Sequence, residues 1–154
     1  MTVTECKRVR LSGTVQVPLP PEGAFGLFTP EGMRAWRPSW EPQYPASEAD
    51  TTEPGTVFDT EHDSHVTTWI VVRCEPGQPL LYARVKPDKR AGLVTITLER
   101  QPDDTTEATI DYDLTTLVPE GNAELDEYAA QYQQMLGHWQ QLIAHEIAES
   151  YVPA

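Results

Sequence analysis

Apolar and polar residues alternate along six segments of the chain, a period of two that is typical of β-strands with one buried face. The first segment is residues 8–17, "RVRLSGTVQV". The other five are rich in β-branched and aromatic residues and cover 56–62, 66–74, 80–86, 92–100 and 106–117. Because short connections such as "EPGQP" and "QPDD" separate them, the pattern predicts an antiparallel meander.

The stretch between the first and second predicted strands has a different composition. Proline at the start of "PEGAFGLF" predicts a helix of about two turns over residues 21–28, and "EGMRAW" predicts one more short turn at 31–36. Residues 37–54 are rich in Pro, Ser, Glu and Thr, which indicates a long loop with a short strand near 40–44. This loop is expected to cover a neighbouring part of the fold.

A long amphipathic helix is predicted at the C-terminal end, from Asn122 to about Ser150. Asn122 is expected to be the N-cap, since acidic residues that suit the positive end of a helix dipole follow it. Apolar side chains recur on one stripe, consisting of Leu125, Tyr128, Ala129, Tyr132, Leu136, Trp139, Ile143 and Ile147. Because one apolar stripe requires one apolar partner surface, the helix is expected to pack on the sheet.

These elements predict an α+β fold, in which a curved antiparallel sheet of six to seven strands wraps around a long C-terminal helix, with two short helices after the first strand. The chain has 154 residues, 39% of them hydrophobic, and no internal repeat, so a single domain over residues 1–154 is expected. A strongly twisted sheet that packs on one helix leaves a gap where the two surfaces diverge. Trp36 and Trp40 are expected at the mouth of that gap.

Several local sequences follow one another in an order that is characteristic of a known family. They are "PPEGAFGLFT", "EGMRAW", "PGTVFDTEH", "TTWIVV", "YDLTTLVPEGN" and the long final helix. In this order the chain resembles the SRPBCC superfamily, the START-like and birch-pollen-allergen-like helix-grip proteins, which include polyketide cyclase/dehydrase relatives. Small bacterial members of this kind carry Glu where this chain has Met33 and Gly where it has Ser39.

The resemblance implies a helix-grip fold, in which a seven-stranded sheet grips the C-terminal helix around an apolar cavity. Members bind lipids, sterols, aromatic polyketides or hormones, cyclise polyketides, or activate the ATPase of a heat-shock chaperone. Since the fold alone does not choose among these activities, three hypotheses follow. The first is binding of a small hydrophobic or aromatic molecule between the sheet and the helix. The others are a cyclase- or aromatase-like enzyme and a cochaperone-like interaction protein.

The charge and the cysteine content limit which classes of partner are expected. Eleven basic and 24 acidic residues give a net charge of −13, which would repel a phosphate backbone, so no nucleic-acid partner is expected. No apolar run approaches bilayer-spanning length and no leader pattern is found, so a cytoplasmic protein without membrane insertion is expected, as a monomer or homodimer. Cys6 and Cys74 form no C-x-x-C motif and are interpreted as reduced thiols.

The candidate ligand-binding residues are mostly aromatic. Rings supply large apolar faces, and their N–H or O–H groups are expected to orient a polar ligand atom. The alternative for each ring is simple core packing. The predicted set is Trp36, Trp40, Phe58, Thr60, His62, Trp69, Tyr82, Arg84, Tyr132, Leu136 and Trp139.

For three polar members of this set, the sequence leaves open whether the side chain points into the cavity. His62 shares a strand face with Phe58, so it would orient a ligand or act as a general base inside the cavity, or else it is an exposed residue at a strand end. Tyr82 and Arg84 share one face of their strand, and alternation alone does not say whether that face points inward. If it does, Arg84 would bind a ligand carboxylate.

The remaining motifs indicate no cofactor and no metal. "DTEHDSH" at 59–65 is split by the strand pleat, so its side chains would not converge on zinc. "HEIAE" at 145–149 has Glu149 where a zinc-protease helix requires a second His, which favours a solvated pair. No nucleophile elbow or phosphate-binding glycine loop is present, so catalytic residues stay unassigned and whether the protein is an enzyme stays open.

Overall fold

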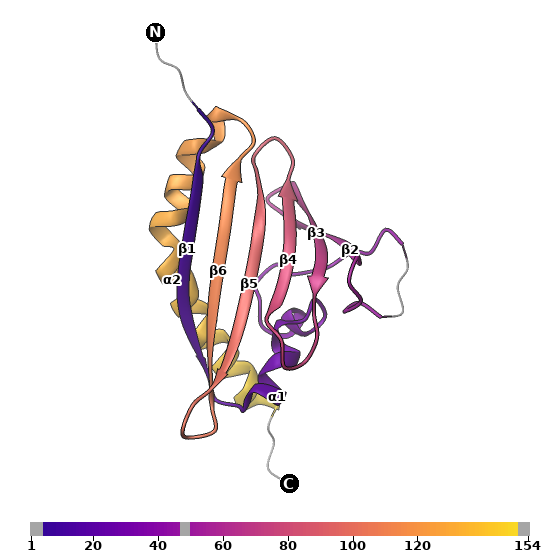
Figure 1. Ribbon diagram of the computed structural model, residues 1–154, viewed down its shortest axis with the longest axis vertical. Helices are drawn as coiled ribbons and strands as arrows, with labels where there is room; N and C mark the ends of the chain where they lie inside the picture. Colours follow the sequence, from indigo (N-terminus) through magenta and orange to yellow (C-terminus); the bar gives the residue numbers. More distant parts are fainter. Residues whose placement is uncertain (1–4, 47–49, 151–154) are drawn as a thin grey trace.

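The computed structural model describes residues 5–46 and 50–150. A six-stranded antiparallel sheet forms one layer, and a long helix lies across one of its faces (Figure 1). The strands are β1 (Arg8–Val17), β2 (Val57–His62), β3 (His65–Arg73), β4 (Leu80–Lys86), β5 (Arg90–Arg100) and β6 (Thr106–Thr116). Their order in the sheet is β1-β6-β5-β4-β3-β2, so β2 to β6 form the predicted meander and β1 pairs with the last strand.

Short helical turns follow β1, as the sequence predicts. They are α1 (Pro21–Ala24), η1 (Phe25–Phe28) and η2 (Gly32–Ala35), with Pro21 at the first helical position. The loop after them makes one isolated β-bridge, between Gln43 and Asp59, rather than the short strand expected near 40–44. The sheet of the described residues therefore has six strands and not the seven that the resemblance implies.

The helix α2 (Asn122–Ser150) follows a 3-10 turn, η3 (Pro119–Gly121), and has the predicted length. Its expected N-cap is wrong, because Asn122 has helical dihedral angles, φ −61° and ψ −42°. The Asn122 side chain instead accepts a hydrogen bond from Thr116 Oγ1 and donates one to the Glu5 carbonyl. It therefore ties the start of the helix to the end of β6 and to the N-terminal segment.

The main core lies between the inner face of the sheet and the buried stripe of α2, which consists of Leu125, Tyr132, Leu136, Trp139 and Ile143. Tyr132 donates a 2.5 Å hydrogen bond to the Ile110 carbonyl of β6. Leu136 fits against Gly13 of β1, where an added Cβ would lie 2.5 Å from the leucine Cδ1. The helix thus packs closely on β1 and is joined to β6 through Tyr132 (Figure 1).

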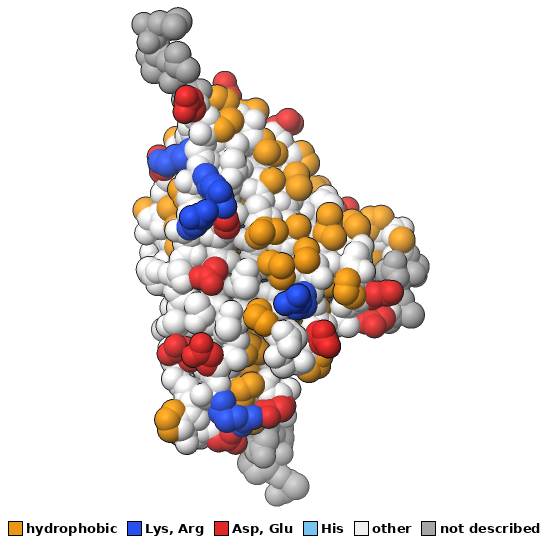
Figure 2. Space-filling view, viewed as in Figure 1, with side chains coloured by type: hydrophobic (Ala, Val, Ile, Leu, Met, Phe, Trp, Pro, Cys, Tyr) orange, Lys and Arg blue, Asp and Glu red, His pale blue; other side chains and the backbone are white. Residues whose placement is uncertain are grey.

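The outer face of the sheet carries exposed apolar side chains over β2 to β5 (Figure 2). Val57, Ile70, Ala83 and Leu93 form one row across these four strands, because each is the register partner of the next. Because neighbouring residues of a strand point to opposite faces, Phe58, Trp69 and Arg84 lie on the inner face.

Candidate functional site

A cleft of about 370 Å³ opens where the sheet and the helix diverge, on the β2, β3 and β4 side of the inner face. We call it the arginine cleft. Its walls come from three places, namely the inner face of β2 to β5, the loop after η2 and the middle of α2. It is lined by Arg37, Pro38, Ser39, Trp40, Thr60, Glu61, His62, Thr67, Trp69, Arg84, Lys86, Arg90, Tyr128, Met135, His138 and Trp139.

Tryptophan rings form the apolar walls of the arginine cleft. Trp40 and Trp69 meet edge to face with centroids 5.3 Å apart. Their indole N–H groups are already used, since Trp40 Nε1 donates to the Pro30 carbonyl at 2.8 Å and Trp69 Nε1 donates to Thr60 Oγ1 at 2.9 Å. The expectation that these N–H groups orient a ligand is therefore wrong. They fix the rings, which offer the cleft apolar surface.

Arg37 lies between two of these rings. Its guanidinium carbon is 4.3 Å from the centroid of Trp40 and 4.6 Å from that of Trp139, distances typical of cation–π contacts. The following turn contains Ser39 at φ 58°, in the left-handed region that favours glycine, the residue that the resemblance places there. This turn brings Arg37 and Trp40 to the same cleft.

Arg84 lies on β4 directly opposite Trp69 of β3, with its guanidinium carbon 4.9 Å from the centroid of that ring. Only 7% of the residue is exposed, and Nε is buried without a hydrogen-bond acceptor. Burial lowers the pKa of the Arg84 guanidinium, and the positive charges of Arg90 and Arg37 lower it further. The Tyr82/Arg84 face of the strand is therefore the inner one, which answers the question that alternation left open.

The other two cations of the cleft have an acidic partner. Glu124 of α2 lies 2.9 Å from Arg90 and 3.6 Å from Lys86, and 3.5 Å from Lys89 outside the cleft. The hydrogen bond from Arg90, with the charges of the two lysines, lowers the pKa of Glu124 from 4.5 to about 2. This carboxylate therefore stays ionised and holds the end of the β4–β5 hairpin against the helix.

The lowered pKa of Glu124 predicts how stability depends on pH. Because Glu124 in the unfolded chain takes up a proton near pH 4.5 and in the folded chain only near pH 2, its stabilising effect is present above pH 4.5 and is lost as the pH falls toward 2. Glu124→Gln is expected to cost about 1 kcal/mol or less at pH 7, since the pair is partly exposed. The difference in urea unfolding between wild type and variant is expected to shrink at pH 3. An equal difference at both pH values would contradict this assignment.

Comparisons with known proteins concern the fold. No protein-family model and no curated protein sequence matches the chain. Among solved structures, a START superfamily protein from Mycobacterium smegmatis superimposes with a TM-score of 0.68 at 16% identity, over 92% of this chain and 99% of that one. The chain therefore has the same fold as this START superfamily protein.

Two further structures extend this START-like similarity. Ginseng major latex-like protein 151 from Panax ginseng has a TM-score of 0.62 at 11% identity, over 95% of this chain and 99% of that one. CalU16 from Micromonospora echinospora has a TM-score of 0.60 at 17% identity, over 94% and 90%. The predicted helix-grip architecture is thus confirmed, and identities this low carry the fold alone.

Six of the predicted ligand-binding residues lie together on the arginine cleft of this START-like fold. They are Trp40, Thr60, His62, Trp69, Arg84 and Trp139. The other five pack in the core outside it, and they are Trp36, Phe58, Tyr82, Tyr132 and Leu136. Trp36 Nε1 donates to the Leu27 carbonyl and the Tyr82 hydroxyl donates to the Phe28 carbonyl, each at 2.8 Å. A ligand contact for these five stays a prediction.

His62 lies at the rim of the cleft and not inside it. Its strand face is the inner one, as predicted, but its side chain is 72% exposed and Nε2 is 3.2 Å from the Asp63 carboxylate. Proton transfer within a closed cavity therefore has little structural basis at His62. The alternative of an exposed histidine at a strand end is the one that the geometry favours.

Several cleft residues were not predicted from the sequence, namely Arg37, Lys86, Arg90, Tyr128, Met135 and His138. Lys86 follows Arg84 by two residues on β4 and so faces the same side of the sheet, which alternation alone could have predicted. Arg90 is the register partner of Lys86 across the β4–β5 turn. Arg37 had no comparable signal, because its position depends on the loop.

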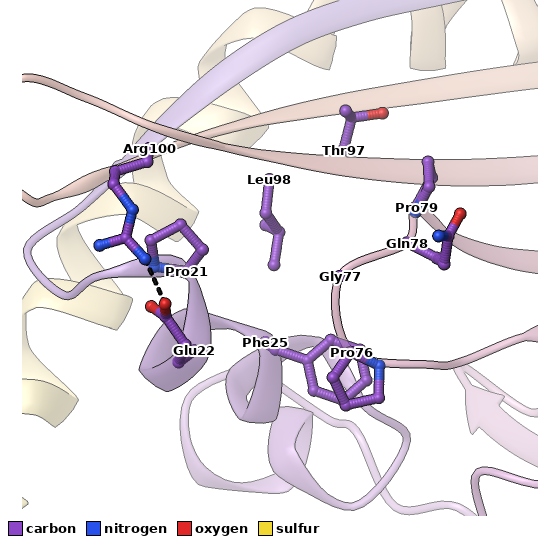
Figure 3. A pocket seen from close by; sticks show the side chains of 10 residues that line it. All are labelled: Pro21, Glu22, Phe25, Pro76, Gly77, Gln78, Pro79, Thr97, Leu98 and Arg100. Atoms are coloured by element: carbon purple, nitrogen blue, oxygen red, sulfur yellow. Dashed lines mark hydrogen bonds and ion pairs between the residues drawn. The ribbon is translucent and has the colours of Figure 1, made fainter.

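A second cavity, of about 450 Å³, lies at the other end of the sheet, between α1 and the β3–β4 loop (Figure 3). We call it the proline cavity, since Pro21, Pro76 and Pro79 line it with Phe25 and Leu98. Figure 3 shows the ion pair between Glu22 and Arg100 at one side of it. None of the predicted ligand-binding residues reaches this cavity.

Residues 5–46 and 50–150 contain no group of three His, Cys, Asp or Glu side chains placed to hold a metal ion. His145 and Glu149 form an exposed i,i+4 pair 3.9 Å apart, as the sequence predicts. Across the same part of the chain, no helix is both long and apolar enough to cross a bilayer.

Proposed function

We propose that the protein binds a small molecule with an apolar or aromatic body in the arginine cleft. The observation that carries the proposal is the set of Trp40, Trp69 and Trp139 rings around a volume of about 370 Å³ between the sheet and the helix. This volume falls within the range of about 300–1,000 Å³ that is usual for small-molecule sites, which are mostly apolar with a few polar groups. The START-like fold supports a site in this place.

One residue in each site allows the cleft and the proline cavity to be tested separately. Thr67 on β3 lines the arginine cleft, and Leu98 on β5 points into the proline cavity (Figure 3). Thr67→Met would place a longer apolar side chain in the cleft, and Leu98→Phe would place a larger one in the proline cavity. For probes that bind wild type, Thr67→Met is expected to weaken affinity about tenfold or more, and Leu98→Phe to leave it unchanged.

The measurement is isothermal titration calorimetry with 2-naphthamide, 2-naphthoate, a flavonoid, a sterol and decanoate, together with native mass spectrometry of the purified protein. A stronger effect of Leu98→Phe than of Thr67→Met would move the site to the proline cavity. Failure of all five probes and the absence of a bound mass would contradict the proposal. The enzyme and interaction-protein alternatives, the single domain, the cytoplasmic location and the monomeric or dimeric state stay predictions.

A further inference from the structure

The arginine cleft has a charge opposite to that of the whole protein. The chain has a net charge of −13, yet the cleft is lined by four cations, Arg37, Arg84, Lys86 and Arg90. Glu61 is the only carboxylate among the lining residues, and it is exposed at the rim. Within the described residues it forms no ion pair with any of the four. The cleft therefore carries excess positive charge, of which Glu124 of α2 offsets only the part at Lys86 and Arg90.

Two of these four cations have no carboxylate partner in the part of the chain that the structure describes. Glu124 pairs with Lys86 and Arg90, as described above. Within residues 5–46 and 50–150, neither Arg37 nor Arg84 forms an ion pair, and the hydrogen bonds of the Arg37 side chain are long ones, to Met33 Sδ at 3.6 Å and the Tyr112 hydroxyl at 3.5 Å. Both guanidinium carbons lie within 6 Å of the Trp69 ring, so the two free charges face one region of the cleft.

Arg84 is the more unusual of the two. A cation that is 93% removed from solvent, with no hydrogen-bond acceptor among the described residues, is costly to hold in a folded protein. The contact with the Trp69 ring offsets only part of the cost of burying the Arg84 charge, and the neighbouring cations repel the Arg84 guanidinium.

We propose that Arg84, with Arg37 beside it, binds the carboxylate of an aromatic or apolar organic acid whose body lies against the tryptophan walls of the cleft. This inference rests on the proposed function and specifies its ligand class. A guanidinium that stacks flat on a ring keeps its N–H edge available, and that edge matches the two oxygens of a carboxylate. The ligand would supply an acceptor to the terminal N–H groups of Arg84, for which none is found among the described residues.

A carboxylate fits this position better than a phosphate. The guanidinium groups of Arg37 and Arg84 lie over the Trp40 and Trp69 rings, an arrangement that suits a planar, singly charged group. A phosphate monoester carries up to two charges and loses more hydration on burial. Phosphate is therefore an outcome that the experiment distinguishes.

The first experiment compares probes that share one apolar body. Calorimetric titration of the wild-type protein with 2-naphthoate, 2-naphthamide and 2-naphthyl phosphate varies only the head group. The carboxylate is expected to bind about ten- to a hundredfold more tightly than the neutral amide, as is usual for charged hydrogen bonds. It is also expected to exceed the phosphate, and its advantage over the amide is expected to fall with salt only weakly, since the pair is buried.

Variants then locate the preference. Arg84→Met removes the charge at similar length, and it is expected to abolish the preference for naphthoate while naphthamide affinity changes less than threefold. Arg100→Met is the matched control, since Arg100 lies at the proline cavity and pairs with Glu22 and Asp104. It is expected to leave both affinities unchanged. Arg84→Lys keeps the charge without the fork and is expected to retain part of the preference.

The melting temperature separates a ligand-binding role from a structural one. If Arg84 serves a ligand, Arg84→Met is expected to melt at the same temperature as wild type or higher, because a buried charge without a partner is removed. A clear drop in melting temperature would assign Arg84 to structure and overturn the inference. If Arg84→Met fails to fold, Arg84 is likewise assigned to structure. Arg37→Met then tests whether the preference for naphthoate over naphthamide depends on the second guanidinium.

The outcomes distinguish this inference from the proposed function. Equal affinities for naphthoate and naphthamide, both weakened by Thr67→Met, would overturn the inference and support the cleft as a binding site. A preference for the phosphate would overturn the carboxylate assignment. No binding of any probe would remove the proposed function and the inference with it.

Discussion

Replacement of Trp36 by alanine is expected to lower the free energy of unfolding by about 3–5 kcal/mol, the usual cost of truncating a large buried aromatic residue. Trp36 is only 6% exposed and packs edge to face on Phe28 and on Trp139, at centroid distances of 5.9 and 5.5 Å. Its Nε1 donates to the Leu27 carbonyl. The ring therefore joins the short helical turns to α2.

Urea denaturation followed by circular dichroism measures this loss. Trp36→Phe is the control, because it keeps an aromatic ring and removes the hydrogen bond, and it is expected to cost less, about 1–2 kcal/mol. A loss below about 1 kcal/mol for Trp36→Ala, together with lost affinity for 2-naphthoate, would show instead that Trp36 is a lid over the cleft.

The sequence was sufficient for the fold because each element has a strong local signal. Period-two alternation gives the strands, the proline at residue 21 starts the short helices, and one apolar stripe identifies the long helix. The prediction that Asn122 is the N-cap was wrong because η3 continues directly into α2. The Asn122 side chain therefore forms hydrogen bonds with Thr116 and Glu5 instead. Capping preferences assume an isolated helix start, which this chain lacks.

The site was harder to predict, because alternation assigns a face and not a depth. Tyr82 and Arg84 lie on the same inner face of β4, yet Tyr82 fills the core under the helical turns and Arg84 reaches the cleft. The difference comes from the helical turns after β1, which cover Tyr82 through Phe28, whereas Arg84 faces the cleft. No periodic pattern within β4 contains that information.

Arg37 shows a second limit of the sequence. Its importance comes from stacking between Trp40 and Trp139, residues that are 3 and 102 positions away along the chain. A loop rich in proline gives no period from which such a position can be predicted. The charge of the cleft likewise emerges only when strands and loop are assembled, since the sequence as a whole is acidic.

A methyl group added at Gly92 is expected to destabilise the protein by about 1–3 kcal/mol, because Gly92→Ala overpacks the sheet. A Cβ there would lie 1.8 Å from the Asp113 carbonyl oxygen and 3.0 Å from the Leu114 Cα, both backbone atoms that no side-chain rotation can move. Gly92 is also the register partner of Arg84. Displacement of β5 is therefore expected to weaken naphthoate binding as well as stability.

Gly137→Ala is the matched control with the opposite expected sign. Gly137 lies exposed in the middle of α2, and a Cβ there meets nothing within 4 Å. Alanine is expected to stabilise the helix by about 0.5–1 kcal/mol, since glycine has the larger backbone entropy in the unfolded chain. Urea unfolding of both variants measures the two effects. An unchanged free energy of unfolding for Gly92→Ala would mean that β5 and β6 separate without cost. The close approach of these strands would then have no part in positioning Arg84 in the cleft.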